Sequence, residues 1–217
     1  MMTVDKKKFR IIKITAIILF IGIISGNTIM NSQINDNKKS YINNPKLETI
    51  ISSDQWQGNP IENDKFINQE FPFEPTFNMA WRYITERNPQ RESKKNDNYK
   101  LPVECDTSFL KNNKDVIVWL GNASFYIRIN GISIVTDPVF YNASIAKRES
   151  PLPFDPNLLR NINYILISHD HRDHLDKKSL QLLYNNNPKT EILSGLKMDD
   201  LFNDMIKNPK VQTAGWY

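Results

Sequence analysis

Residues 164–176 read Tyr-Ile-Leu-Ile-Ser-His-Asp-His-Arg-Asp-His-Leu-Asp, and this stretch decides the fold. Its first four residues form a continuous apolar run, which is typical of a strand covered on both faces of a sheet. The next positions hold all three histidines of the chain, His169, His171 and His174. A polar cluster directly after a buried strand lies at the strand's carboxyl end, where open α/β sheets bind ligands. The stretch therefore predicts an α/β sheet that carries a functional site at one edge.

The spacing of the three histidines favours a metal site. In extended backbone, His169 and His171 project to the same side, while Asp173 and His174 fall on the turn into the next element. Imidazole together with carboxylate suits zinc or another first-row divalent ion, whereas carboxylates alone would indicate calcium or magnesium. Two histidines on one side and an Asp-His pair on the other indicate two adjacent metal positions. The alternative is a solvent-exposed polar loop that is rich in histidine by chance.

The residues around this stretch predict a sheet with helices packed on it. Asn130-Gly131 joins two strand-like runs and is a strong signal for a tight hairpin turn. Asp176 is expected to cap the helix that follows the histidines. Strands that alternate with helices predict a layered α/β domain. The expected elements are strands at 116–120, 125–129, 132–135 and 164–167, a helix at 177–185, a strand at 191–193, a helix around 198–206, and a strand at 211–213.

Charge and cysteine content exclude two classes of protein. The chain of 217 residues has 28 Lys+Arg and 24 Asp+Glu, a net charge of +4. Five basic residues and one acidic residue in the first thirteen positions account for this excess, which leaves 23 of each sign in the rest. That balance provides no basic face for nucleic acid. The single cysteine, Cys105, excludes an intramolecular disulfide and a Cys-rich zinc module.

The part of the chain before the α/β domain is expected to carry a membrane leader. A basic start followed by an uncharged apolar run at 14–24 has the layout of a secretory signal or an uncleaved anchor. Either would place the remainder outside the cytoplasm, as a membrane-anchored or secreted protein. The aromatic residues around 71–83 predict a flap packed on the core, or a lid for an apolar ligand. The expected division is a signal anchor or signal peptide at 1–26, a polar tether at 27–64, an aromatic flap and linker at 65–113, and the α/β domain at 114–217.

The pattern His169-x-His171-x-Asp173-His174 resembles the metal-binding signature of the metallo-β-lactamase superfamily. Two flanking motifs, Trp-Leu-Gly-Asn-Ala-Ser at 119–124 and Thr-Asp-Pro-Val-Phe at 136–140, resemble the branch that contains N-acylphosphatidylethanolamine-hydrolysing phospholipase D. The resemblance extends over about 81–217. It implies an αβ/βα sandwich, of which 114–217 would be the first half.

The resemblance also implies a function and a set of ligands. His169 and His171 would bind a first zinc ion, and Asp173 and His174 a second. Two such ions share a water molecule and lower its pKa, and Asp173 would both ligate a metal and orient the nucleophile, as the catalytic residue. The expected protein is an exported zinc-dependent hydrolase acting on a phospholipid-like or other small phosphodiester. The leader at 1–26 would be the part of the chain that contacts the membrane.

The family completes this site with a further His, a bridging Asp and a final His, whereas no histidine follows His174 in this chain. We therefore expect the first half of a metal site. Such a chain is either a truncated, non-catalytic fragment or metal-binding module, or a chain whose site a second polypeptide completes.

Outside the signature, two polar residues have expected supporting roles and a third departs from the family pattern. Asp137 matches the family's strand-end aspartate, which supports the metal site from behind, although on spacing alone it is equally a turn residue before Pro138. Asp170 is a candidate for a hydrogen bond behind the ligands. Asn122 departs from the family pattern, since relatives often carry His at this position.

Overall fold

The computed structural model describes residues 40–142 and 147–217. The expected leader at 1–26 and the first part of the expected tether lie outside these residues. In the described part of the chain, no helix is long and apolar enough to cross a membrane.

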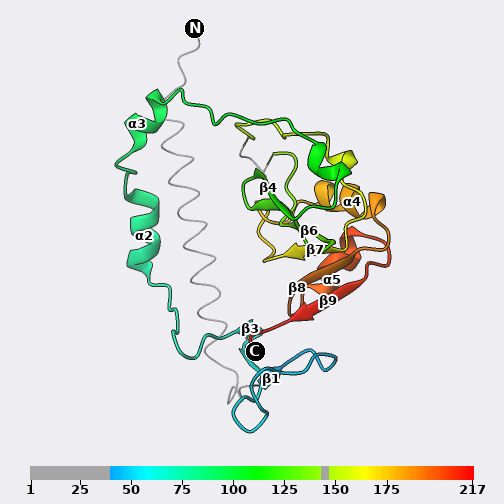
Figure 1. The fold of residues 1–217 in the computed structure, drawn as a ribbon. Coiled ribbons are helices and arrows are strands. Elements are labelled where there is room, and N and C mark those ends of the chain that lie inside the picture. The colour runs from blue at the N-terminus through cyan, green and yellow to red at the C-terminus, as the bar shows by residue number, and fades with distance from the viewer. Residues whose placement is uncertain (1–39, 143–146) are drawn as a thin grey trace.

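A six-stranded mixed sheet forms the body of the protein, with its strands in chain order (Figure 1). The first three strands are antiparallel, and the last four run parallel to one another. Asn130 and Gly131 have positive φ values of 50° and 78°, as a tight hairpin turn requires. The predicted α/β class and hairpin are therefore confirmed. The strands are β4 (Val116–Gly121), β5 (Ser124–Ile129), β6 (Ile132–Thr136), β7 (Tyr164–Ile167), β8 (Glu191–Gly195) and β9 (Val211–Ala214).

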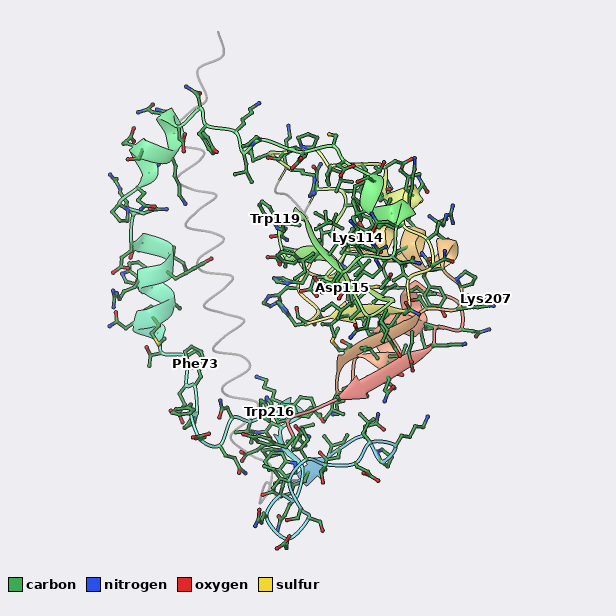
Figure 2. All side chains as sticks on the ribbon, in the orientation of Figure 1. Phe73, Lys114, Asp115, Trp119, Lys207 and Trp216 are labelled. Atoms are coloured by element: carbon green, nitrogen blue, oxygen red, sulfur yellow. The ribbon has the colours of Figure 1, made fainter. Side chains whose placement is uncertain are left out.

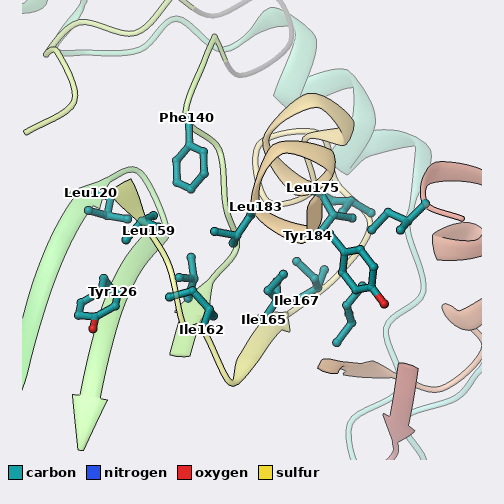
Figure 3. Close-up of a cluster of buried hydrophobic side chains, with 14 of the residues drawn as sticks. Leu120, Tyr126, Phe140, Leu159, Ile162, Ile165, Ile167, Leu175, Leu183 and Tyr184 are labelled. Atoms are coloured by element: carbon teal, nitrogen blue, oxygen red, sulfur yellow. The ribbon is translucent and has the colours of Figure 1, made fainter. Parts of the chain in front are cut away.

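Two helices, α4 (Lys177–Asn186) and α5 (Asp199–Met205), cover one face of this sheet. Figure 3 shows Leu183 and Tyr184 of α4 next to Ile165 and Ile167 of β7. Burial of this apolar area is the main force that joins the helices to the strands. The connections contain two short 3-10 helices, η2 (Ser108–Lys111) and η3 (Pro156–Leu158). Fully buried members of the core are Val135, Leu159, Ile165, Leu180, Leu183, Ile192 and Phe202.

The opposite face of the sheet is largely open among the described residues. Ile117, Trp119 and Leu166 are 66%, 50% and 43% exposed, and they alternate along their strands with buried neighbours. Figure 2 shows Trp119 on the side of the sheet away from α4. The prediction that the 164–167 strand is covered on both faces is wrong, because Ile165 and Ile167 pack into the core whereas Leu166 faces outward.

Two strands of a small three-stranded antiparallel sheet lie in the segment for which the sequence predicted a polar tether, and the third begins the predicted flap and linker. The strands are β1 (Ser40–Ile42), β2 (Asn59–Glu62) and β3 (Lys65–Phe66). The side chain of Asn59 accepts a hydrogen bond from the backbone N–H of Trp216 at 2.7 Å, and Trp56 meets Tyr217 edge to face at 5.3 Å. These strands therefore depend on contacts with the far end of the described chain, which local periodicity cannot reveal.

The aromatic segment forms α2 (Phe77–Thr85), and α3 (Arg91–Asn96) follows in the expected linker. Thr76 caps α2 by accepting a hydrogen bond from Met79 N. Neither helix contains a buried residue, and both stand apart from the six-stranded sheet (Figure 1). The expectation of a flap packed on the core is therefore wrong for α2, because its apolar residues make no buried contact with that core.

Candidate metal centre

The carboxyl ends of β6 and β7 bring Asp137 and Ser168 together, because these two strands are parallel neighbours. Asp137 is buried and has a φ of 36°, in the left-handed region that a residue with a side chain rarely adopts. Its Oδ1 accepts a hydrogen bond from Ser168 N at 2.7 Å, and its Oδ2 accepts one from Ser168 Oγ at 2.7 Å. The carboxylate thus fixes the start of the histidine loop to the end of β6.

Ser124 supports the unusual backbone of Asp137 from the other side. This fully buried side chain donates to the carbonyl oxygen of Asp137 at 2.6 Å and accepts from Val139 N at 3.0 Å. Ser124 and Ser168 belong to the sequence motifs at 119–124 and 164–176, but the sequence predicted no role for either residue. The available signal was a small polar residue directly beside each turn of the predicted site.

Hydrogen bonds determine which ring nitrogen of two histidines is free. Asp137 Oδ2 lies 3.0 Å from His174 Nδ1, and because a carboxylate only accepts, the proton is on Nδ1. Ser168 Oγ gives its one proton to Asp137, so it accepts from His169 Nδ1 at 2.9 Å. Both rings therefore keep the lone pair on Nε2 available. This is the usual way in which an outer carboxylate or hydroxyl prepares an imidazole as a metal ligand.

The four expected ligands lie together on one loop, at different depths. The ring centroid of His169 is 4.5 Å from that of His171 and 4.1 Å from that of His174. Asp173 Oδ2 lies 3.7 Å from His174 Nε2. His171 and Asp173 are exposed, whereas His169 and His174 are half-buried.

The chemistry of these side chains fits a first-row divalent ion, since imidazole nitrogens and a carboxylate are the ligands that zinc prefers. The arrangement of these side chains does not form a complete metal site. Within residues 40–142 and 147–217, no three His, Cys, Asp or Glu side chains form a group that could hold a metal ion. The chain brings the expected ligands into one loop without closing them around a single point.

Asn122, for which the sequence offered no role, contacts the histidine loop directly. It occupies the turn between β4 and β5 with a φ of 51°, and its Nδ2 donates to the backbone carbonyl of Asp173. The indole N–H of Trp119 donates to the carbonyl of Asn122 at 2.8 Å. The side chain thus links the β4–β5 turn to the loop that carries the expected catalytic aspartate.

Two other acidic residues near the motif have simpler surroundings. Asp176 accepts a hydrogen bond from Ser179 N at 2.9 Å, and the prediction that it caps α4 is confirmed. Asp170, expected behind the ligands, is exposed.

Residues 116–212 match the family described as Beta-lactamase superfamily domain. This match confirms the resemblance of these residues to the superfamily that was seen in the sequence. A mixed sheet with helices on one face is consistent with the first half of the expected αβ/βα sandwich.

Curated proteins similar to this chain include hydrolases of the expected branch. N-acyl-phosphatidylethanolamine-hydrolyzing phospholipase D 1 of Caenorhabditis elegans is 27% identical over 162 residues, which cover 67% of this chain and 45% of that protein. The mitochondrial protein of the same name from Saccharomyces cerevisiae is 38% identical over 68 residues, which cover 29% and 14%. A UPF0173 metal-dependent hydrolase of Methanopyrus kandleri is 37% identical over 59 residues, which cover 27% and 23%. The chain thus spans less than half of the length of each of these relatives.

Proposed function

We propose that this chain functions in a metal-dependent hydrolase that cleaves a phosphodiester bond in a phospholipid-like or other small substrate. The observation that carries the proposal is the set of hydrogen bonds that joins Asp137 directly to His174 and, through Ser168, to His169, and that leaves two imidazole Nε2 atoms free. The names of the relatives support the reaction class, since two are phospholipases D and a third is a metal-dependent hydrolase.

The residues that would hold the metal are His169, His171, Asp173 and His174, and zinc is the ion that we propose. A bound divalent ion supplies positive charge that stabilises substrate oxygens and lowers the pKa of water. The chain's own residues determine which imidazole nitrogen carries the proton. Asp137 keeps the proton of His174 on Nδ1, and the exposed carboxylate of Asp173 would orient the nucleophile.

One observation favours a second candidate, a module that binds metal without catalysis. The described residues contain no group of three potential ligands around one point. A weakly binding module, or a chain whose site a second polypeptide completes, would have this arrangement. We also propose that the protein is exported and held at a membrane by residues 1–26, on the strength of their basic and apolar sequence alone.

Metal analysis combined with a hydrolysis assay tests these proposals. The full chain is loaded with zinc and dialysed, its metal content is measured by mass spectrometry, and its rate on bis(p-nitrophenyl) phosphate is recorded. We expect bound zinc and activity, both lost in His169→Ala and both kept in Asp204→Asn, a control at an exposed carboxylate of α5. Zinc without hydrolysis would favour the metal-binding module. No retained metal would contradict the hydrolase and would leave only a module that binds metal weakly.

A further inference from the structure

A cleft of about 660 Å³ lies beside the histidine loop. Its lining includes Val118 and Trp119 of β4, Asn122 of the following turn, and Leu101 and Pro151. Asn122 connects the cleft to the candidate metal centre, because it lines the cleft and its side chain binds the carbonyl of Asp173. A ligand in this cleft would therefore lie next to a side chain that is hydrogen-bonded to the loop carrying the expected metal ligands.

Arg148 places a positive charge on the wall of this cleft. Its Nη2 donates to the carbonyl of Leu120 and its Nη1 to that of Val139, at 3.5 Å for the latter. Its Nε is buried and has no hydrogen-bond partner among the described residues. Burial lowers the pKa of Arg148, and the group stays charged near neutral pH, as guanidinium groups do. Two neutral carbonyls occupy two of its five N–H donors, so hydrogen-bonding capacity remains.

The negative charges that line the cleft do not neutralise Arg148. None of the ion pairs in residues 40–142 and 147–217 includes this arginine. Asp106 is occupied by the N–H and hydroxyl of Ser108, both at 2.7 Å, and Glu104 and Glu149 are exposed. A partly buried guanidinium without a carboxylate partner has an unmet preference for an oxyanion.

The glycine of the β4–β5 turn leaves the space that Arg148 occupies. A Cβ at Gly121 would stand 2.7 Å from Nη2 of Arg148, and the φ of Gly121 is 97°. Any side chain at this position would meet the guanidinium and strain the backbone. The position of Arg148 is thus determined by the sequence of the turn and by two backbone carbonyls.

We propose that this cleft binds an amphiphile whose oxyanion pairs with Arg148 and whose apolar chain lies along Val118 and Leu101. Guanidinium binds phosphate and carboxylate oxygens through paired N–H groups, and apolar walls account for most of the contact in small-molecule sites. The relation of this site to hydrolysis rests on the function proposed above. Binding itself requires no metal and is tested separately.

Calorimetric titration of the full chain with monomeric octyl phosphate tests the proposal. We expect Arg148→Gln to bind at least about tenfold more weakly, the effect of losing charged hydrogen bonds. Lys147→Gln, a neighbouring exposed cation in the same cleft, is the matched control and should change affinity less than threefold. Inorganic phosphate and octyl glucoside should each bind at least tenfold more weakly than octyl phosphate. Equal affinity for either would contradict an amphiphile site with an oxyanion head.

Two further measurements keep the result independent of folding and of catalysis. Arg148→Lys retains the positive charge and should therefore bind octyl phosphate more tightly than Arg148→Gln. The affinity of the wild type for octyl phosphate should fall with added salt. If Arg148→Gln does not fold, a salt-independent wild-type affinity overturns the proposal. His169→Ala should bind octyl phosphate as the wild type does, even when zinc binding and hydrolysis are lost. Loss of octyl phosphate binding in His169→Ala would instead assign the anion to the histidine loop and contradict the cleft.

Discussion

At the scale of single residues, the candidate centre depends on one strained aspartate. Asp137 adopts a left-handed backbone conformation, and its two carboxylate oxygens accept three hydrogen bonds from the histidine loop. Strain of this kind persists only where surrounding contacts compensate for it. Ser124 and Ser168 provide those contacts, so the strain is localised where the ligands must be oriented.

Asp137→Asn tests this role, because asparagine has the same size and tolerates positive φ. Its amide has one accepting oxygen and one donating nitrogen, so it cannot accept all three hydrogen bonds that the carboxylate accepts from Ser168 N, Ser168 Oγ and His174 Nδ1. We expect zinc affinity to fall about 10–100-fold, which is typical when an outer partner of a metal-binding histidine is lost. Competition with a chromogenic chelator measures the affinity. Asp170→Asn, at an exposed position in the same loop, is the control, and equal affinities of both variants and wild type would exclude the role.

Asn122→Asp isolates the single donor that connects the β4–β5 turn to the histidine loop. Aspartate keeps the shape of the side chain and its tolerance of positive φ, but its carboxylate cannot donate to the carbonyl of Asp173. We expect the free energy of unfolding to fall by about 0.5–1.5 kcal/mol, the value of one typical hydrogen bond, because the exposed carbonyl loses its donor and faces a carboxylate oxygen instead. Urea denaturation measures the change. Asn161→Asp, at another exposed left-handed asparagine, should change it little, and a similar loss there would refute a specific link.

At the scale of elements, α4 combines a polar cap with an apolar face. Asp176 caps its first turn, and Leu180, Leu183 and Tyr184 are buried at helical spacing. We expect Asp176→Ala to lower the free energy of unfolding by about 1 kcal/mol, because Ser179 N loses its acceptor. Urea denaturation checks this value, with Lys189→Ala, at an exposed position after the helix, as the control. An unchanged midpoint for Asp176→Ala would mean that water replaces the cap at no cost.

The elements that sequence could predict are those with local signals. Asn130-Gly131 identified the β5–β6 hairpin, and Asp176 with the leucines after it identified α4, because turn geometry and amphipathic spacing are local properties. The strands β1, β2 and β3 have no such signal. They are two to four residues long and are stabilised partly by Asn59 and Asn44, which contact residues near the end of the described chain.

The candidate site also contains some residues that the sequence predicts and others that it does not. The ligand types and their order are visible in the sequence, because metal chemistry restricts them to few residue types. Positions that act through the backbone, such as Ser124 and Asn122, are not visible, since their contacts depend on the parallel register of β6 and β7 and on the course of the loop.

At the scale of the whole molecule, the small sheet and the large sheet meet through contacts between distant residues. Asn59 is 2% exposed, donates to Ile42 O at 3.1 Å and accepts from Trp216 N at 2.7 Å. Asn44 Nδ2 donates to Thr213 O of β9 at 2.7 Å. The small sheet therefore docks on the edge strand through a few polar contacts, whereas the large sheet has its own apolar core.

This asymmetry predicts that the small sheet can open without the large one. Asn59→Ala removes the partner of the N–H of Trp216 and of the carbonyl of Ile42, and a typical hydrogen bond of this kind contributes about 0.5–1.5 kcal/mol. Because the core beneath α4 and α5 is untouched, we expect faster amide hydrogen exchange in β1–β3 and unchanged exchange in β6–β8. Hydrogen exchange with mass spectrometry resolves the two regions, and Asn68→Ala, at an exposed loop position, is the control. If amide exchange became equally faster in both sheets, the two sheets would open as one cooperative unit. The contacts of Asn59 would then stabilise the whole domain and not the small sheet alone.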